Sequence, residues 1–399
     1  MSGDEFRSHL CGRLIPFWKR LRDIQYGGYY GWMDSGLKVD REAVKGCILN
    51  SRILWFFSNA SMCLGKEEDS LQEYSRQAYC FLKEKCLDSK HGGVYWSLSY
   101  KGEPEDTTKH TYNQAFAVYA LSSYFRAYHD AEALELAGEL IEVIETRCFD
   151  EYGYREALDR EFRPIANDKL SENGVMADRT MNTLLHVMEA YTEYLLACRE
   201  AVSQKRSWQQ VVREKLYWIL NLVAERVYNP TLHRQEVFFN RDMESLIDLH
   251  SYGHDIEAAW LIDRCLEVLG DGQLTERMSP ILRCLEAEVY EKAYACHSLA
   301  NECERGVVDE KRVWWVQAEG VVGFYNAYQK TKEHHYLEAA EDIWGFIQKY
   351  LVDERLTGEW FWYTDAAGHP ALEKPIVEPW KCPYHNGRMC MEMMRRSAE

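Results

Sequence analysis

The chain has 399 residues and a formal net charge of −17, with 46% hydrophobic and 28% charged residues. A surface of this sign repels a phosphate backbone, and no basic arm or stripe of Lys and Arg offsets it, which argues against nucleic acid as a partner. The N-terminal MSGDEFRSHL carries charges where a signal peptide needs an apolar segment, and no segment approaches the ~18 apolar residues that span a bilayer. We therefore expect a cytoplasmic protein whose partners include neither nucleic acid nor a membrane.

The numbers of cysteine and aromatic residues further limit the class of protein. The 13 cysteines include no CxxC pair, which fits reduced, buried thiols better than a disulfide framework. Aromatic residues make up 13% of the chain, with 13 Trp and 26 Tyr. Such rings suit flat, amphipathic ligands such as sugars, although their more common use is to fill a large helical core.

Apolar residues spaced three and four apart predict helices along most of the chain from Glu42 onward. The clearest stretches are 48–63, 113–129, 181–198, 255–269 and 314–328. No run reads convincingly as a strand.

Short glycine-aromatic segments recur between these helices, at 27–32, 92–97, 152–156 and 358–362. Glycine permits a tight hairpin, and intervals of roughly sixty residues leave room for two helices in each unit. No linker rich in Pro, Gly or Ser interrupts the series. We therefore predict one all-α domain over residues 1–399, a toroid of about six helix pairs whose inner helix ends surround a central cavity.

A first candidate acid/base group lies in HSYGHDIEAAW, residues 250–260. Gly253 marks the start of a helix, which places His254 near the positive N-terminal end and Glu257 one turn later on the same face. A carboxylate there can hold one imidazole nitrogen and leave the other to exchange protons. His250, His254 and Glu257 also have a tolerable spacing for a metal ion, but the Tyr-Gly dipeptide places His250 before the helix, so we favour a site without metal.

A second candidate lies in WKCPYHNGRMCME, residues 380–392, which combines an aromatic wall with one histidine and two cations. His385 and His254 come from distant segments and together suggest paired acid/base chemistry. Lys381 and Arg388 belong to the same cluster, although a solvent-exposed face remains an alternative for both.

Two inner-helix stretches carry further polar groups. Asn182, His186 and Glu189 lie at i, i+4 and i+7, which puts them on one face of an otherwise apolar helix. That face could bind hydroxyl groups in a cavity, or it could form a buried polar ladder between helices, which is the more common outcome. Arg52 begins a strongly apolar stretch, so its charge must reach solvent, be paired inside, or bind an oxyanion.

The segment WWVQAE places Trp314 and Trp315 side by side, followed by Glu319. Adjacent residues cannot both face the same side of a helix. One ring could therefore stack on a ligand while the other lies in the core, and the sequence does not say which.

These clusters also share a recognisable pattern. The blocks SRILWFFSNA, KHTYNQAFAVYALSSY, YGYREALDR, MNTLLHVMEAYTE, SYGHDIEAAWLIDR, RVWWVQAE and WKCPYHNGRMCME resemble the cellobiose 2-epimerases, within the N-acylglucosamine 2-epimerase superfamily. The resemblance runs nearly end to end.

The resemblance implies an (α/α)6 barrel that epimerises C2 of the reducing-end aldose of β-1,4-linked disaccharides without a cofactor or metal. Cellobiose would give glucosyl-mannose and lactose would give epilactose, by ring opening, removal of the C2 proton, an enediolate, and reprotonation on the opposite face. The implied partners are sugars, namely cello-oligosaccharides, lactose and mannobiose, and the implied state is a monomer or weak homodimer.

The resemblance also implies roles for individual residues. His254 and His385 would exchange protons, Glu257 would orient His254, Arg52 would support charge on the carbonyl oxygen, and His186 would assist ring opening. The residues that would bind the sugar are Tyr112, Asn182, Trp314, Trp315, Glu319 and Trp380.

Sibling activities remain alternatives. An aldose–ketose isomerase of the mannose/glucose type would protonate the same enediolate at C1, and an N-acylglucosamine 2-epimerase would act on an acylated sugar. Glycoside hydrolases of this fold use paired carboxylates, and a non-catalytic sugar-binding toroid would need only the aromatic residues. Two histidines and one arginine fit these last two classes poorly.

Overall fold

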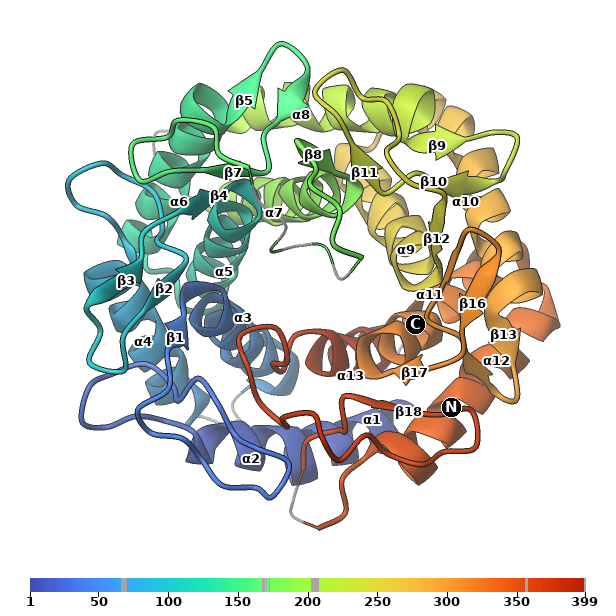
Figure 1. Cartoon of the computed structure of the whole chain (residues 1–399), viewed down its shortest axis with the longest axis horizontal. Helices are drawn as coiled ribbons and strands as arrows, with labels where there is room; N and C mark the ends of the chain where they lie inside the picture. The colour runs from blue at the N-terminus through green and yellow to red at the C-terminus, as the bar shows by residue number, and fades with distance from the viewer. Residues whose placement is uncertain are drawn as a thin grey trace.

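The computed structural model describes residues 1–65, 70–166, 169, 171, 173–201, 208–355 and 358–397. In this part of the chain the helices form six pairs arranged as a closed double ring (Figure 1). The inner ring consists of α3 (Cys47–Leu64), α5 (Thr111–Tyr128), α7 (Met181–Glu200), α9 (Tyr252–Leu269), α11 (Trp314–Thr331) and α13 (His385–Arg396). The predicted all-α toroid, an (α/α)6 barrel, is confirmed.

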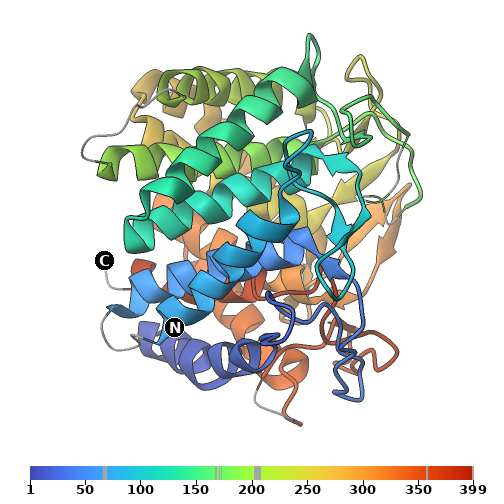
Figure 2. The ribbon, with the colours of Figure 1, turned by 90° about the vertical axis from the view of Figure 1, so that its left-hand side faces the viewer.

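The outer ring surrounds the inner one (Figure 1), and in the side view the helices run along the barrel with the strands at its right-hand end (Figure 2). The helices of the outer ring are α1 (Gly3–His9), α2 (Ile15–Arg20), α4 (Leu71–Phe81), α6 (Ala131–Val143), α8 (Gln209–Leu222), α10 (Gly272–Ala293) and α12 (His334–Phe346). Five-residue π-helical segments join α1 to α2 and extend α4, α6, α8 and α12. They are η1 (Leu10–Leu14), η3 (Leu82–Cys86), η4 (Ile144–Cys148), η5 (Val223–Val227) and η6 (Ile347–Leu351).

The difference between the two layers follows from their sequences. Every residue from Thr111 to Phe125 of α5 is buried, because neighbouring inner helices and an outer helix enclose it, and none of these residues carries a charge. The outer helix α6 buries only one stripe and carries acidic residues on its other face. Trp18, Trp260, Trp314 and Trp360 are among the largest fully buried side chains, so many aromatic rings serve the core.

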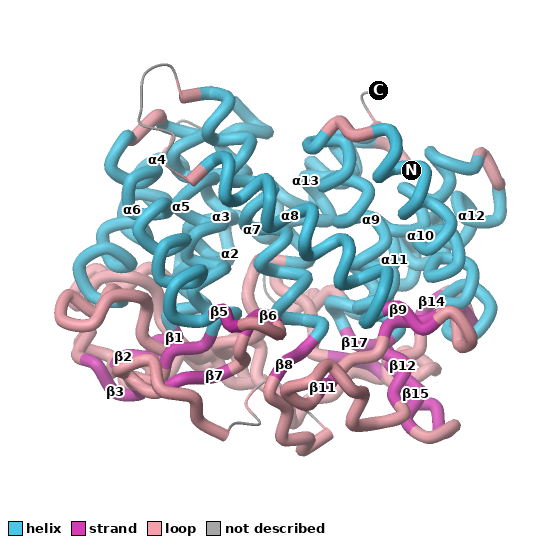
Figure 3. Tube along the Cα trace, turned by 90° about the horizontal axis from the view of Figure 1, so that it is seen from above, coloured by secondary structure: helices cyan, strands magenta, loops and turns pink. Residues whose placement is uncertain are grey.

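Short strands gather at one end of the barrel (Figure 3). None of those in the described residues exceeds three residues, which is too short for the alternation that marks a strand in a sequence. They are β1 (Lys45–Gly46), β2 (Ser97–Leu98), β3 (Pro104–Asp106), β4 (Lys109–His110), β5 (Phe149–Asp150), β6 (Gly153–Tyr154), β7 (Ala157–Leu158), β8 (Arg179–Thr180), β9 (Tyr228–Asn229), β10 (Arg234–Gln235), β11 (Phe238–Phe239), β12 (Leu249–Ser251), β13 (Tyr294–Ala295), β14 (Ser298–Leu299), β15 (Glu302–Glu304), β16 (Val307–Asp309), β17 (Arg312–Val313) and β18 (Tyr363–Thr364).

These strands fix where the inner helices begin. β1, β4, β8, β12 and β17 each lead directly into an inner helix and pair in antiparallel fashion with β2, β7, β11, β15 and β18 of the following unit. Because each entry strand is hydrogen-bonded to the next unit, the N-termini of the inner helices are held together at the strand-bearing end.

The predicted glycine-aromatic hairpins are turns stabilised by aspartate. Oδ1 of Asp23 accepts hydrogen bonds from the backbone N–H groups two and three residues later, and Asp88 and Asp150 do the same in the next two units. Gly28 has a φ of +64°, and a Cβ there would lie 2.7 Å from Oδ1 of Asn50. Both conformation and space therefore require glycine at this position.

Two expectations from composition can be compared with the structure. All 13 cysteines are free thiols, with Cys11 and Cys296 exposed. Among the described residues, every helix is too short or too polar to serve as a membrane span.

Candidate active site

A cavity of about 600 Å³ lies where the N-termini of the inner helices meet. Its volume is typical of a pocket for a small organic ligand. Ten of the eleven predicted site residues line it: Arg52, Tyr112, Asn182, His186, His254, Glu257, Trp314, Trp315, Trp380 and His385. The fold thus brings together side chains from all six inner helices or the segments that lead into them.

Carboxylates hold two of the cavity histidines. Nδ1 of His186 lies 2.8 Å from Oε2 of Glu189, and Nδ1 of His385 lies 2.7 Å from Oε1 of Glu319. Because a carboxylate accepts hydrogen bonds, we assign the ring hydrogen to Nδ1 in both imidazoles, which leaves Nε2 with a free lone pair. Neither Nε2 has a hydrogen-bond partner among the described residues, so both can accept a proton from a ligand.

The third histidine has a different partner from the predicted one. Nδ1 of His254 lies 2.7 Å from the hydroxyl of Ser251. Glu257 instead accepts a hydrogen bond from Arg388 through Oε1, and its Oε2 has no hydrogen-bond partner. The prediction that Glu257 orients His254 is therefore wrong, because a buried carboxylate is stabilised more by a guanidinium than by a neutral imidazole.

Burial keeps all three imidazoles uncharged. Burial, followed by the effect of the nearby imidazole of His186, lowers the pKa of His254 to about 3. Burial, followed by the positive charge of Arg388, lowers the pKa of His385 well below its usual range. Burial also lowers the pKa of His186, against the opposing effect of Glu189. The neutral form is the one that can remove a proton from a substrate.

Arg52 is a buried cation without a carboxylate partner. Its side chain is 2% exposed, and Nη2 donates to the hydroxyl of Tyr112 at 2.7 Å while Nη1 reaches the carbonyl of Trp380 at 3.4 Å. The guanidinium lies 4.2 Å from the ring centre of Phe116 and 4.8 Å from that of Tyr384. No described carboxylate forms an ion pair with it. Arg52 therefore neither reaches solvent nor pairs with a described carboxylate, and its role as an oxyanion partner stays a prediction.

The structure distinguishes the two adjacent tryptophans. Trp314 is 2% exposed, and Nζ of Lys381 lies 4.6 Å from its ring centre. Trp315 is half-buried, with its ring centre 4.8 Å from that of His254 and 5.4 Å from that of His385. Trp315 therefore faces the space between the two histidines.

Glu319 does not lie on the cavity wall, so its predicted role in binding the sugar is wrong. The residue is 1% exposed. Its Oε1 accepts hydrogen bonds from His385 and Arg388, both at 2.7 Å, and its Oε2 accepts one from Trp260 at 2.9 Å. Because the protein itself uses these acceptors, Glu319 holds His385 from behind.

Sequence reasoning missed the positions of the two C-terminal cations. Arg388 is 1% exposed and contacts Glu189 on one side of the barrel and Glu319 on the other. Lys381 is fully buried and lies 3.3 Å from Glu359. The solvent-exposed alternative is wrong for both. The apolar residues that follow Arg388, at 389–391, are a signal that this face of the helix is buried.

Metal-ligating residue types also meet at the cavity wall. Glu257, Glu319 and His385 each offer one potential ligand atom, and these atoms lie within 4.8 Å of one another. A guanidinium already donates hydrogen bonds to both carboxylates. His250, considered above as a metal ligand, lies 2.9 Å from Asp255 instead.

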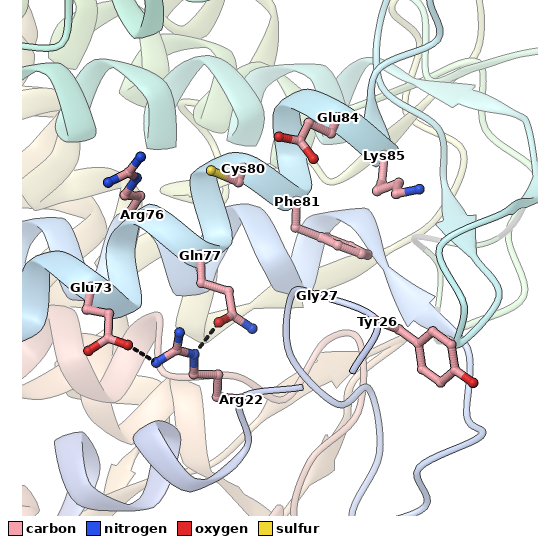
Figure 4. A pocket seen from close by; sticks show the side chains of 10 residues that line it. All are labelled: Arg22, Tyr26, Gly27, Glu73, Arg76, Gln77, Cys80, Phe81, Glu84 and Lys85. Atoms are coloured by element: carbon pink, nitrogen blue, oxygen red, sulfur yellow. Dashed lines mark hydrogen bonds and ion pairs between the residues drawn. The ribbon is translucent and has the colours of Figure 1, made fainter. Parts of the chain in front are cut away.

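A smaller pocket of about 260 Å³ lies on the outer layer, between α4 and the turn at 26–27 (Figure 4). Arg22 crosses it and contacts Glu73 and Gln77. None of the predicted site residues lines this pocket.

A toroid of helix pairs with three imidazoles around a small-molecule cavity defines an (α/α)6-barrel protein with acid/base groups at its centre. The chain belongs to the N-acylglucosamine 2-epimerase (GlcNAc 2-epimerase) family, whose model matches residues 28–386. This confirms the resemblance found in the sequence and places the chain among carbohydrate epimerases, which are isomerases.

Individual relatives extend the match to the whole chain. The chain is 47% identical to the cellobiose 2-epimerase of Eubacterium cellulosolvens, over 100% of both chains, and 47% identical to that of Ruminococcus albus, over 99% of both. A solved sugar epimerase from a ruminal bacterium has a TM-score of 0.94 at 47% identity, covering 99% of this chain and 98% of its own. The cellobiose 2-epimerase of Bacillus thermoamylovorans has a TM-score of 0.91 at 43% identity, covering 99% of both chains.

Proposed function

We propose that this protein epimerises C2 of the reducing-end aldose of β-1,4-linked disaccharides, converting cellobiose to glucosyl-mannose and lactose to epilactose. The observation that carries the proposal is the arrangement of His254 and His385. Both line one cavity, both are neutral, and both lie within 5.4 Å of the ring centre of Trp315. Inversion at carbon needs a proton acceptor on one face and a donor on the other.

The chemistry begins with ring opening, because C2–H is acidified only when an aldehyde stands at C1. A proton must leave the anomeric hydroxyl and another must reach the ring oxygen. His186 is suited to this exchange, since its Nε2 is unpaired and its ring centre lies 5.1 Å from that of Tyr112 on the cavity wall.

Removal of the C2 proton by one imidazole leaves an enediolate, whose oxygens carry the charge. Arg52 is fixed in the cavity wall before any substrate binds, and a fixed donor in a water-poor site stabilises such an oxyanion without reorganisation. The second imidazole takes up a proton from solvent and transfers it to C2 from the opposite face, and the first imidazole releases its proton to solvent, after which the ring closes.

Polar and aromatic groups of the cavity supply sugar recognition. Oδ1 of Asn182 is buried and has no hydrogen-bond partner, so a sugar hydroxyl that donates to it satisfies an atom otherwise left unpaired. Trp315 and Trp380 are half-buried and line the cavity, where their rings can pack on the apolar face of a pyranose.

Product analysis by NMR tests the proposal. The protein is incubated separately with cellobiose, lactose, mannobiose, mannose and an N-acylglucosamine. We expect glucosyl-mannose and epilactose from the first two substrates. A ketose as the main product would overturn the epimerase assignment in favour of an aldose–ketose isomerase, and turnover of N-acylglucosamine alone would assign the acylated sugar as substrate.

A further inference from the structure

A buried cluster of one guanidinium and three carboxyl groups lies beside the cavity, with Glu257 on the cavity wall. Arg388 comes from α13, and Glu189, Glu257 and Glu319 come from α7, α9 and α11, so four inner helices meet at this point. Each of the four residues is 5% exposed or less. Arg388 contacts all three carboxyl groups, which gives a surplus of negative charge unless a proton is shared among them.

We propose that Arg388 is the positioning residue of the site. Through Glu189 and Glu319 it holds His186 and His385 with the ring hydrogen on Nδ1, and thereby presents both Nε2 atoms to the cavity as proton acceptors. The inference rests on the proposed function for its catalytic consequence, although the arrangement of hydrogens can be measured without substrate.

The contacts form two continuous chains that start from one guanidinium. Nη1 of Arg388 lies 2.5 Å from Oε1 of Glu189, whose Oε2 lies 2.8 Å from Nδ1 of His186. Nη2 lies 2.7 Å from Oε1 of Glu319, and the same oxygen lies 2.7 Å from Nδ1 of His385. A planar fork can donate in both directions at once, which the single ammonium of a lysine cannot do in the same geometry.

Arg388 decides the tautomer because it keeps Glu319 ionised. Burial raises the pKa of the Glu319 carboxyl, and the guanidinium opposes this rise. Without the guanidinium the buried carboxyl group takes up a proton and becomes a donor. Nδ1 of His385 would then accept, its hydrogen would move to Nε2, and the cavity would face a donor instead of a base.

Loss of the Arg388 guanidinium should also move the pH dependence of activity in a definite direction. Removing one positive charge raises the proton affinity of the His385–Glu319 pair, whichever of the two takes the proton. The working form, neutral His385 beside ionised Glu319, then needs a higher pH. The titratable and charged groups that face His385 are Arg52 from α3, His186 and Glu189 from α7, Glu257 from α9, Glu319 from α11, and Arg388 and Tyr384 from α13 and its cap.

Three variants of the full-length protein test the proposal: Arg388→Lys, Arg388→Met, and Arg388→Met combined with Glu319→Gln. Arg264→Lys serves as the control, since Arg264 also bridges two carboxylates of the barrel, Glu193 at 3.1 Å and Glu392 at 3.0 Å, but contacts no histidine of the cavity. The measurements are kcat and KM across pH, and ¹⁵N NMR of the imidazoles, which separates Nδ1-protonated from Nε2-protonated rings.

For Arg388→Met we expect kcat to fall by about 10²-fold or more, with KM changed much less, and the acidic limb of the kcat profile to move to higher pH. The NMR spectrum of this variant should show the hydrogen of His385 on Nε2. Arg388→Lys keeps the positive charge but not the planar fork, so its kcat should fall while its acidic limb moves less than that of Arg388→Met. In the double variant position 319 can no longer take up a proton, so the acidic limb should return towards its wild-type position. Because Trp260 donates to one side-chain oxygen at position 319, the amide nitrogen faces Nδ1, and the hydrogen of His385 should stay on Nε2.

Wild-type tautomers and an unshifted acidic limb in Arg388→Met would overturn the proposal, as would an equal loss of kcat in Arg388→Lys and Arg264→Lys. If Arg388→Met does not fold, wild-type kcat in Arg388→Lys would overturn the proposal, because a lysine cannot hold both carboxylates in the geometry of the guanidinium. Because the tautomers are read without substrate, a tautomer change in a protein that lacks epimerase activity would keep the positioning role and refute the proposed function instead.

Discussion

Replacing Arg52 with methionine should lower activity without destabilising the protein. Removing one donor to a developing oxyanion lowers kcat by ~10²–10³-fold in enzymes that use such donors. Arg52 lines the cavity and forms no ion pair with a described carboxylate, so its removal leaves no buried carboxylate unpaired. Methionine has a similar length and can fill the space between the neighbouring rings.

The effect on stability is a balance of opposing contributions. The change loses a charged hydrogen bond to Tyr112, about 1.5–3 kcal/mol, and the contact of the cation with Phe116, about 2 kcal/mol. It also removes the desolvation penalty of a buried, unpaired ion, which is several kcal/mol. We expect the free energy of unfolding to change by no more than about 1 kcal/mol in either direction.

The assay compares kcat/KM for cellobiose with urea unfolding of the same preparation. Arg264→Met is the matched control, because it strips Glu193 and Glu392 of a partner and should lower the free energy of unfolding by as much as about 3 kcal/mol. An Arg52→Met protein that keeps wild-type kcat, or that is destabilised as much as Arg264→Met, would refute the reasoning.

Three further predictions concern histidines and metal. His254→Ala and His385→Ala should each lower kcat by ~10²–10⁴-fold, while the exposed His369→Ala should not; a folded His385→Ala protein with normal turnover would remove that residue from the mechanism. Exhaustive chelation should leave activity unchanged, and loss restored by one divalent ion would contradict this expectation. Burial lowers the pKa of His110 to about 3, so the unfolded chain binds a proton there from pH 6.5 downward while the folded one does not. This group should therefore lower the free energy of unfolding by up to about 1.4 kcal/mol for each pH unit below pH 6.5. His110→Phe should reduce the slope of the free energy of unfolding against pH, measured by urea unfolding between pH 7 and 5. An unchanged slope would show that His110 is charged in the folded state.

The sequence predicts the helix pairs and the turns because both depend on local patterns. Residues 113–129 read as a helix from their apolar spacing, and α5 covers Thr111–Tyr128. The glycine at position 28 sits in a turn whose aspartate is five residues away. Strands of two or three residues have no such pattern, because pairing with the next unit creates them.

The contacts among the buried charges that hold the cavity histidines could not be predicted in the same way. Arg388 and Glu189 are 199 positions apart in the chain, and His385 and Glu319 are 66 apart. Spacing along one helix suggested Glu257 as the partner of His254, but a guanidinium from another helix binds that carboxylate. Which of several buried charges pair is decided by the geometry of the closed ring, which a single helix does not contain.

Epimerisation in deuterated water tests the two-histidine mechanism most directly. A proton taken from C2 by one imidazole stays on that imidazole, and the opposite face receives a hydrogen from a different group in exchange with solvent. The account predicts that glucosyl-mannose formed from cellobiose carries deuterium at C2, measured by NMR at conversions where the reverse reaction is negligible. Complete retention of the original hydrogen at C2 would contradict it.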